Sequence, residues 1–396
     1  MCQGSCVAAR TLNQLRLVGV AGANKVMAGE ASRLARRAFD DVRLPAPKKQ
    51  GGSLIYPFEP RLAGLWLHYH RTSARLLWDL YESDANRLEG LYEDLKRAIL
   101  EDPRLRWSSG TLTLSARNVQ DFAAGERQVV GAVKNALVDA SRERGVLLSV
   151  DPEHFDYAFW VRGQEGRWVV SLDLAGQPMH ERGYRLLPGG APLREDLAAL
   201  VVMLSRFDAR NEALVDPMAG AGTLAIEAAL LATAAPSWSA SRRPLASSVA
   251  LGPDGIDQRG PLFADTRAAV FANERDPEVF RCLEANAGTA SVSLTTRLGD
   301  FRDLDPNELR QWALAQGKSS GVIVCNPPYG ERTSGREPEL QRTYRDLWSW
   351  CRRFRGWRLA VIVANPDFLS AMGERPRITK PLSNGPLRGY FHSFDL

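Results

Sequence analysis

Strand-like and helix-like segments alternate strictly in the second half of the chain, and this pattern limits the fold more than any other feature. The strand-like segments are short and nearly continuous in apolar residues, and they cover 213–217, 269–274, 292–298, 321–325 and 358–365. Strands joined by helices run in the same direction, and uninterrupted apolar runs are typical of strands buried on both faces. The alternation therefore predicts a parallel sheet covered by helices on both sides. Two further strand-like runs flank Asn384-Gly385, a strong signal for a hairpin turn.

The first half gives weaker and more mixed signals. We expect strands over 62–70 and 111–117, helices over 74–100 and 126–145, and a hairpin over 156–176 built from aromatic and β-branched residues. Helices interleaved with a few mixed strands predict a small α+β unit.

The beginning of the chain is harder to read. Residues 1–15 show no periodic pattern and are expected to lack regular structure, 22–39 has helical spacing, and 43–53 is a Pro-, Lys- and Gly-rich loop candidate. His68 and His70 fall on the expected strand over 62–70. Because zinc needs three or four ligands and no third ligand is near in sequence, we expect structural roles for both histidines.

Composition narrows the class of protein. The 396 residues predict two or three domains, and 44% hydrophobic with 24% charged residues is typical of a folded chain. The net charge of +5 leans to the first half, with 26 Lys and Arg against 22 Asp and Glu in residues 1–190 and 25 against 24 in 191–396. No apolar run approaches the ~18 residues of a membrane span, and the five cysteines form no ligand cluster. We expect a cytoplasmic protein without metal or membrane partner.

Polar residues follow the first three strands of the alternation. The first strand ends at Asp216 and leads into Gly220 and Gly222, the second ends at Glu274, and the third leads to Asp300. Gly220, Gly222 and Ala225 have the G-x-G-x-x-A spacing of a dinucleotide turn, whose free backbone N–H groups face an anionic ligand. Each feature alone is also typical of plain strand-to-helix packing or of helix caps. Together at one sheet edge they favour a nucleoside cofactor.

The fourth strand ends in Asn326-Pro327-Pro328-Tyr329. Proline cannot donate to the sheet ladder, so the chain must leave the sheet there as a stiff loop. A plain strand stop is the simpler interpretation, because Asn365-Pro366 ends the next strand without a second proline or a tyrosine. Rigid carbonyls with an Asn amide offer acceptors to a planar amino group, and Tyr329 offers a face on which a base can stack.

These residues carry a family resemblance. "NPPY" after the fourth strand, with "DPMAGAGT" and Glu274, resembles the S-adenosylmethionine-dependent methyltransferases that modify exocyclic amines. The strings "HERGYRLLPGGAPLREDLAALVV", "NERDPEVFRCLEANA" and "LSNGPLRGYFHSF" are similar to the THUMP-domain guanine-N2 methyltransferases of 23S ribosomal RNA and their tRNA relatives. The likeness is close over about 175–396 and looser over 56–175. Ala219 and Ala221 stand where family members often carry Cys or Ser.

The resemblance implies a fold and its domains. It implies an α/β protein with a Rossmann-like class I methyltransferase domain over 190–396, whose mostly parallel seven-stranded sheet ends in an antiparallel hairpin. A THUMP-like RNA-binding domain would cover 56–180, and the poorly matched residues 1–55 would belong to a ferredoxin-like α+β region.

The resemblance also implies a site and its chemistry, methyl transfer to N2 of a guanosine. Asn326 and Pro327 would accept the amine N–H bonds and Tyr329 would stack on the base. S-adenosylmethionine would be held by Asp216, Gly220, Gly222, Thr223, Glu274, Asp300 and Asn326. Arg117, Arg127 and Lys134 are candidate phosphate contacts in the THUMP-like stretch, although a solvated surface is an equally good interpretation of each. The RNA partner is expected to be ribosomal RNA, with transfer RNA as the alternative. From a different class of function, the chain could be a catalytically inactive RNA-binding assembly factor.

Overall fold

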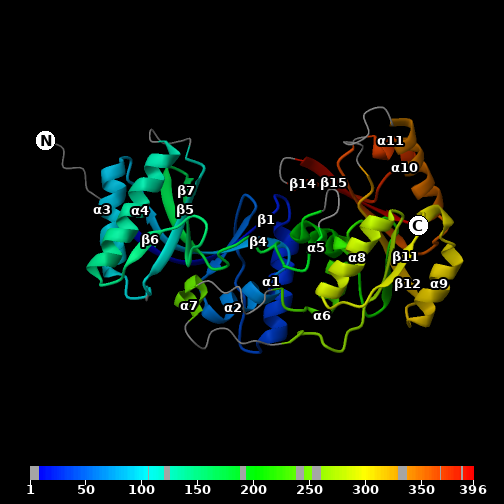
Figure 1. Ribbon diagram of the computed structural model, residues 1–396, viewed down its shortest axis with the longest axis horizontal. Coiled ribbons are helices and arrows are strands. Elements are labelled where there is room, and N and C mark those ends of the chain that lie inside the picture. The colour runs from blue at the N-terminus through cyan, green and yellow to red at the C-terminus, as the bar shows by residue number, and fades with distance from the viewer. Residues whose placement is uncertain are drawn as a thin grey trace.

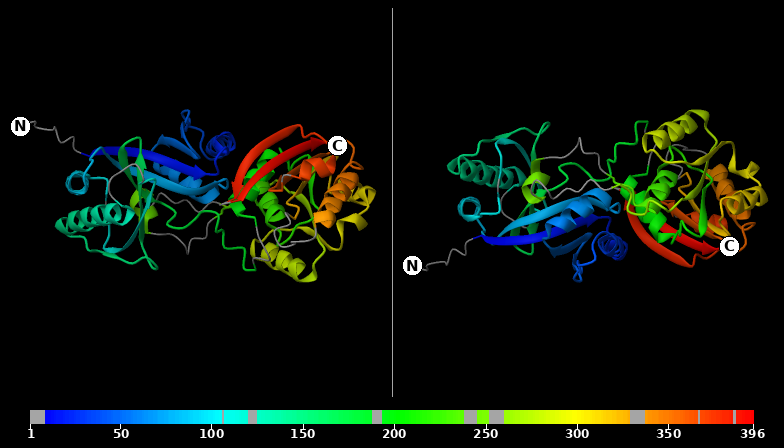
Figure 2. Two further views of the ribbon diagram at one scale, coloured as in Figure 1. Left: turned by 90° about the horizontal axis from the view of Figure 1, so that it is seen from above. Right: turned by 90° about the horizontal axis from the view of Figure 1, so that it is seen from below.

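Two β-sheets lie side by side along the long axis of the molecule (Figure 1). The structure is a computed structural model that describes residues 9–105, 107–119, 125–187, 193–237, 245–251, 260–328, 337–365, 367–384 and 387–396. Residues of the first half build one sheet and residues from 212 onward build the other. The two regions occupy successive parts of the long axis and adjoin each other in the views from above and below (Figure 2).

The first sheet has eight strands in the order β2-β3-β1-β4-β8-β7-β5-β6. Most neighbours are antiparallel, whereas β5 runs parallel to both β6 and β7. The strands are β1 (Arg10–Gly19), β2 (Lys48–Gln50), β3 (Ser53–Pro57), β4 (Ser73–Ser83), β5 (Gly110–Arg117), β6 (Leu148–Val150), β7 (Tyr157–Gln164) and β8 (Arg167–Asp173). One continuous sheet therefore crosses residue 55, and the division of the first half at that residue stays a prediction.

The described helices of this region pack on one face of the sheet. They are α1 (Asn24–Ala38), α2 (Pro60–Tyr69), α3 (Leu88–Glu101), α4 (Glu126–Glu143) and the short α7 (Leu245–Leu251). Leu17, Trp78 and Phe159, on three different strands, share one buried cluster with apolar residues of these helices. In Figure 1, α1, α2 and α7 lie below β1 and β4, and α3 and α4 lie to the left of β5 and β7.

Three sequence-based expectations for the first half are wrong. Residues 60–69 form helix α2 instead of a strand, residues 73–83 form strand β4 instead of the start of a helix, and residues 10–15 belong to β1. Helix α2 is buried from Leu62 to Tyr69, so no polar side reveals its helical period. Strand β4 lies in the middle of the sheet with consecutive residues buried on both faces, so alternation is absent as well.

Several other elements were expected correctly. The helix over 22–39, the strand over 111–117, the helix over 126–145 and the hairpin over 156–176 correspond to α1, β5, α4 and the β7–β8 pair. The expected loop over 43–53 contains the short strand β2, which pairs with β3. His68 and His70 lie in α2 and at its C-cap, not on a strand, and each forms a hydrogen bond to a backbone carbonyl, of Gly64 and Met27 respectively.

The second sheet confirms the predicted parallel architecture. Its order is β11-β10-β9-β12-β13-β15-β14, with the first five strands parallel and an antiparallel β14–β15 hairpin. Asn384 pairs with Leu387 at the turn, and Gly385 lies outside the described residues. The strands are β9 (Glu212–Asp216), β10 (Ala269–Glu274), β11 (Thr295–Leu298), β12 (Ser320–Cys325), β13 (Arg358–Val363), β14 (Ile378–Asn384) and β15 (Leu387–Asp395).

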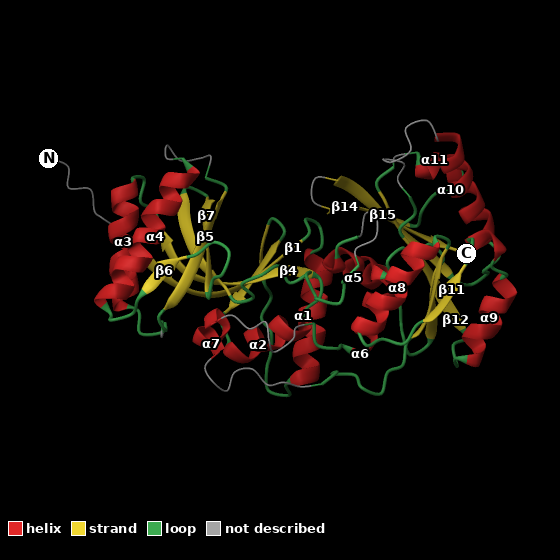
Figure 3. Cartoon of the chain, in the orientation of Figure 1, coloured by secondary structure: helices red, strands yellow, loops and turns green. Residues whose placement is uncertain are grey.

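Helices cover both faces of this sheet (Figure 3). One face packs against α5 (Glu195–Leu204), α6 (Thr223–Thr233) and α8 (Pro277–Thr289), and the other against α9 (Pro306–Ala315), α10 (Glu337–Cys351) and α11 (Phe368–Met372). Residues that alternate along β9 divide accordingly: Leu214 lies in the cluster of the first face, and Val215 in that of the second. Neighbouring residues buried on opposite faces explain the unbroken apolar strands of the sequence.

An acid followed by proline starts three of the described helices, one in the first region and two in the second. Glu59, Asp276 and Asp305 precede Pro60, Pro277 and Pro306, and each carboxylate accepts a hydrogen bond from a backbone N–H of the first turn. The acid satisfies an N–H that the helix leaves unpaired, and proline fits the first turn because it has no N–H to satisfy. These starts fix where α8 and α9 leave the strand edge of the second sheet.

A buried ionic cluster joins the two regions. Glu227 of α6 is completely buried and forms ion pairs with Arg71, which follows α2, at 3.0 Å and with Arg182 at 3.2 Å. Tyr184 donates a hydrogen bond to the same carboxylate at 3.1 Å, and Arg182 donates to the backbone carbonyl of Arg71 at 2.6 Å. Buried charges need such pairing, so this cluster fixes α6 against the first region.

Candidate functional site

The carboxyl ends of the central strands gather the predicted residues at one edge of the second sheet. Strands β9 and β12 are neighbours, while the chain continues from β9 to β10 on the other side, so the strand order reverses between β9 and β12. Ligands of open α/β sheets bind in the crevice at this reversal. Asp216 ends β9 and Asn326 follows β12, so they lie on the two sides of the reversal.

The glycine turn after β9 depends on backbone conformations that favour glycine. Gly220 has φ 57° and Gly222, the N-cap of α6, has φ 89°. A Cβ at Gly222 would meet Leu283 Cγ at 3.1 Å, whereas a Cβ at Gly220 would have no atom within 4 Å. Gly222 is therefore needed for close packing against α8, and Gly220 borders open space. The first N–H groups of α6 are presented beside that space.

Glu274 holds the glycine turn in place. One carboxylate oxygen accepts a hydrogen bond from the Gly220 N–H at 2.9 Å, and the other accepts from the N–H groups of Arg275 and Asp276, both at 2.9 Å. The acid at the end of β10 therefore reaches across to the loop that follows β9. Its position at the strand tip matches the prediction, and the turn contact is an addition that the spacing did not reveal.

Asp300 lies at the end of β11 as predicted and also acts as a cap. Its carboxylate accepts from the Arg302 N–H at the start of the 3-10 helix η2 (Phe301–Asp303), and it forms an ion pair with the Arg302 guanidinium at 2.9 Å. Arg302 also pairs with Asp346 of α10 at 2.8 Å. This ion pair fixes the third strand tip to the neighbouring helix.

Two asparagines of this edge were missed by the sequence reading. The Asn273 amide donates to the carbonyls of Pro217 at 3.1 Å and Gly299 at 2.8 Å, so it ties the loops after β9 and β11 together. Asn286 of α8 donates to the Ala221 carbonyl at 3.1 Å and accepts from the Leu186 N–H at 3.1 Å. Both are about 99% buried. A buried amide inside an apolar strand or helix was the available signal, but the partners lie far away in sequence.

Asp216 has an unusual electrostatic environment. It is completely buried, one carboxylate oxygen accepts from the Met218 N–H at 3.2 Å, and the other has no partner among the described residues. Burial raises the pKa of Asp216 to about 8, and the nearby Glu274 carboxylate adds to the rise. A buried acid with an unsatisfied oxygen beside a glycine turn is typical of a ligand site.

The loop after β12 is held in place by helix α10. Asn326 is half-buried, Pro327 is buried and Pro328 is exposed, and Tyr329 lies outside the described residues. The hydroxyl of Tyr344, a buried residue of α10, donates to the Pro328 carbonyl at 2.6 Å, and its ring packs edge-on against Phe368 with centroids 4.9 Å apart. Helix α10 thus holds the end of the Asn-Pro-Pro segment against the sheet.

The remaining predicted residues are not all brought together. Thr223 begins α6 next to the glycine turn, where its hydroxyl accepts from Arg185 at 3.3 Å. Arg117 ends β5, and its guanidinium lies over the Trp160 ring at 5.2 Å. Arg127 and Lys134 belong to α4, which packs on the opposite face of the first sheet. The three proposed phosphate contacts therefore do not share one surface.

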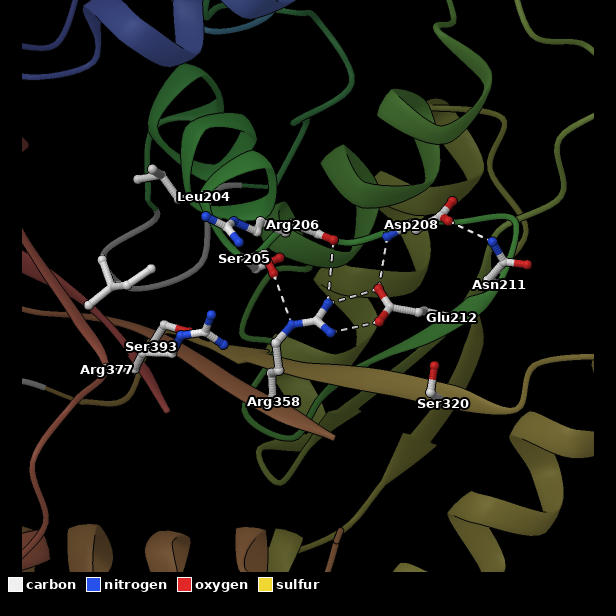
Figure 4. A pocket seen from close by; sticks show the side chains of 11 residues that line it. Leu204, Ser205, Arg206, Asp208, Asn211, Glu212, Ser320, Arg358, Arg377 and Ser393 are labelled. Carbon is white, nitrogen blue, oxygen red and sulfur yellow. Dashed lines mark hydrogen bonds and ion pairs between the residues drawn. The ribbon is translucent and has the colours of Figure 1, made fainter. Parts of the chain in front are cut away.

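A pocket of about 290 Å³ lies at the opposite edge of the second sheet (Figure 4). It is lined by residues at the amino ends of β9, β12 and β13, including Glu212, Ser320 and Arg358. Arg358 and Glu212 form a two-pronged ion pair across it, at 2.8 and 2.9 Å. Because these charges satisfy each other, and because ligands of such sheets bind at the carboxyl ends of strands, we place the candidate site at the other edge.

Two further observations concern metals and membranes. Within the described ranges, no three His, Cys, Asp or Glu residues lie together as metal ligands. None of the described helices combines the length and the apolar character needed to cross a membrane.

Comparison with known protein families gives a match over half of the chain. The family described as the RMKL-like methyltransferase domain matches residues 182–392. Two curated relatives share the name ribosomal RNA large subunit methyltransferase K/L: one from Chromohalobacter salexigens is 34% identical over 65% of this chain, and one from Syntrophotalea carbinolica is 31% identical over 83%. These alignments cover 36% and 47% of the relatives, so this chain spans about half of their length or less.

Solved structures with the same fold cover both regions. The SAH complex of SMU.472 superposes with a TM-score of 0.77 at 19% identity, over 98% of each chain. TrmN from Thermus thermophilus superposes with a TM-score of 0.68 at 18% identity, over 97% of this chain and 99% of TrmN. The complete two-sheet arrangement therefore recurs in other proteins.

Proposed function

Because this chain belongs to the RMKL-like methyltransferase domain family, we propose that it transfers a methyl group from S-adenosylmethionine to the N2 amine of a guanosine in large-subunit ribosomal RNA. The observation that carries the proposal is the pairing, across the central strands β9 and β12, of a glycine turn beside an unsatisfied acid with a rigid Asn-Pro-Pro segment. The names of the curated relatives support ribosomal RNA as the substrate class, and the SAH complex of SMU.472 supports the cofactor.

The residues at the strand tips fit this cofactor. S-adenosylmethionine supplies a methyl group on a positively charged sulfonium. Glu274 would accept hydrogen bonds from the ribose hydroxyls, and Asp300 would accept one from the adenine amine. Gly220, Gly222 and Thr223 would hold the amino-acid part of the cofactor at the start of α6. The open space at Gly220 and the unsatisfied oxygen of Asp216 support this assignment.

Asn326 and Pro327 would orient the target amine. The lone pair of an exocyclic amine is delocalised into its ring, so the two N–H bonds must be held while the nitrogen becomes tetrahedral. The Asn326 side-chain oxygen and the Pro327 carbonyl would accept those two bonds, and Tyr329 would stack on the base. Alignment of this kind can lower a barrier by ~7–11 kcal/mol without a strong base.

The first region would hold the RNA. We assign residues 56–180 to a THUMP-like RNA-binding domain, residues 1–55 to its ferredoxin-like companion and residues 190–396 to the methyltransferase domain. A base that is paired in RNA must leave its stack to reach the site, at a cost of a few kcal/mol that phosphate contacts offset. A cytoplasmic location remains a prediction.

The test compares two asparagines that each precede a proline at a strand end. Asn326→Ala should lower methyl transfer by about 100-fold or more, because one acceptor for the reacting amine is lost. S-adenosylmethionine binding, measured by calorimetry, should change only a few-fold. Asn365→Ala is the matched control and should keep most of the activity. Activity is measured as methyl transfer to ribosomal and transfer RNA from cells that lack the gene.

The outcomes separate the alternatives. Mass spectrometry of the nucleosides should show N2-methylguanosine in 23S RNA. Full activity of Asn326→Ala would refute the assigned site. Methylation of transfer RNA alone would show that transfer RNA is the substrate and would leave the proposed chemistry unchanged. A wild-type protein that binds RNA but not the cofactor would be an assembly factor.

A further inference from the structure

The eight-stranded sheet has one face against which none of the described helices packs. Side chains alternate across a strand, so the face can be read from residues that neighbour one another on adjacent strands. Leu112 and Ala116 of β5 lie in the helix-side cluster, whereas Ser115 and Arg117 point the other way. The side chains of this open face include Arg16, Lys48, Arg75, Asp79, Thr113, Ser115, Arg117, Trp160, Arg162, Ser171 and Asp173.

A tryptophan between two arginines stands near the edge of this open face. Trp160 of β7 is partly exposed, the Arg75 guanidinium lies 4.6 Å from its ring centroid, and the Arg117 guanidinium lies 5.2 Å away. Each cation–π contact contributes ~0.5–1 kcal/mol or more, so the indole holds both guanidinium groups in fixed orientation. Arg75 also pairs with the buried Asp173. Arg117 is exposed and has no carboxylate partner among the described residues.

The open face carries an excess of positive charge. Arg16 and Arg162 share one buried carboxylate, that of Asp79, at 2.7 and 2.8 Å. Burial alone would raise the pKa of Asp79, but the two guanidinium groups outweigh it and lower that pKa, so Asp79 stays ionised. One carboxylate cannot neutralise two guanidinium groups. With Arg75, Arg117, Arg167 and exposed Lys48, the cations on this face outnumber the acids Asp79, Glu82 and Asp173.

This charge lies on the opposite side of the sheet from the other candidate contacts. Arg127 and Lys134 belong to α4, on the helix side. Arg127 lies in the first turn of α4, directly after Glu126. On the same side of the sheet, Tyr92 contacts Lys96 through its ring and Asp139 through its hydroxyl, so positive and negative charges are mixed there. The surface of α3 and α4 therefore lacks both a fixed guanidinium pair and an excess of cations.

We propose that the open face, rather than the surface of α4, is where this chain holds its RNA, as an unpaired strand whose phosphates contact Arg117 and Arg75. The inference rests on the proposed function for its RNA substrate. Fixed guanidinium planes offer charge-assisted hydrogen bonds to phosphate and flat surfaces to unpaired bases. Thr113 and Ser115, beside Arg117 on β5, add hydroxyl groups along the same strand.

The experiment measures the RNA affinity of variants of this 396-residue chain by fluorescence anisotropy. The probe is a fluorescein-labelled single-stranded RNA of mixed sequence, with the same RNA annealed to its complement as a comparison. Arg117→Ala should weaken single-strand binding by about three- to tenfold and lower the slope of log affinity against log salt by about one. The RNA affinity of the control variants Arg127→Ala and Lys134→Ala should stay within about twofold of wild type, because both variants keep the phosphate contacts of Arg75 and Arg117.

A second pair of variants guards against misfolding. Trp160→Ala should weaken binding because both guanidinium groups lose their support, and Trp160→Phe should restore much of it while keeping a ring. Unchanged affinity in Arg117→Ala together with weakened binding in Arg127→Ala would move the contact to α4 and overturn the inference. Stronger binding of the duplex would overturn the unpaired strand. Wild-type protein that methylates no RNA would refute the proposed function instead, whatever the binding result.

Discussion

The two sheets of this protein place polar residues in opposite ways. In the seven-stranded sheet, strands are apolar along their length and polar groups appear at the tips, at Asp216, Glu274 and Asn326. In the eight-stranded sheet, charged side chains such as Asp79 and Arg162 lie on the face of the strands themselves. Helices on both faces leave a parallel sheet only its edge for ligands, whereas a sheet with helices on one face keeps a whole surface. The proposed cofactor site accordingly lies at an edge, and the proposed RNA site lies on a face.

The contact between the two regions gives the largest expected effect. Glu227→Ala should lower the free energy of unfolding by about 5 kcal/mol, because Arg71 and Arg182 would stay buried without their shared carboxylate. Urea unfolding followed by fluorescence measures the change. Glu284→Ala, at an exposed position of α8, is the control and should have little effect. Equal stability of the two variants would show that the regions do not depend on this cluster.

The face of the eight-stranded sheet gives the second effect. Asp79→Asn should cost about 3 kcal/mol at neutral pH, because Arg16 and Arg162 lose their shared charge in a buried setting. The pKa of Asp79 is lowered in the folded protein, so its contribution is present above its ordinary pKa of 3.8 and is lost as pH falls through the folded value. Wild type should therefore lose more stability on acidification than the variant, as measured by urea unfolding at a series of pH values. A parallel loss in both would contradict this assignment.

A substitution of Asp216, at the tip of the seven-stranded sheet, has a smaller expected effect on stability, and it raises stability instead of lowering it. The pKa of Asp216 is raised from 3.8 to about 8, so the folded protein holds a proton that the unfolded chain releases between these values. The stability that this proton provides is complete below about pH 4 and is lost as pH rises through 8. This shift corresponds to several kcal/mol at ~1.4 kcal/mol per pKa unit, and relaxation around the buried carboxylate reduces it, so Asp216→Asn should remove the loss and raise stability at pH 8 by on the order of 2 kcal/mol. Thermal unfolding at pH 5 and 8 without ligand would test it, and a variant that is less stable at pH 8 would refute the raised pKa.

Most of the seven-stranded sheet could be predicted from the sequence. Its strands are buried on both faces and its helices begin with clear signals, such as Asp276-Pro277 and Asp305-Pro306. Because parallel strands end at the same edge, Asp216, Glu274, Asp300 and Asn326 could be assigned to one place before any contact was known. The ties made by Asn273 and Asn286 could not, since their partners Pro217, Gly299 and Ala221 are brought near only by the fold.

The eight-stranded sheet was predicted less well for a physical reason. A sequence period can be recognised only when an element has one apolar side and one polar side. Helix α2 and strand β4 are buried on all sides, so their sequences show no such period. Arg16 and Asp79 interrupt the apolar pattern of β1 and β4, and they are tolerated there because they form a buried ion pair across 63 residues of sequence. Pairing over such a distance leaves no local trace.

Glu227 also determines where the chain can be divided. A fragment that starts at residue 190 would lack both Arg71 and Arg182 and would bury the Glu227 carboxylate without a cation, one helical turn after Thr223. A fragment that starts before His180 would retain Arg182 and Tyr184 and lack only the cation from the first region. Separate expression of the seven-stranded region should therefore be far more sensitive to its first residue than to the absence of the eight-stranded region itself.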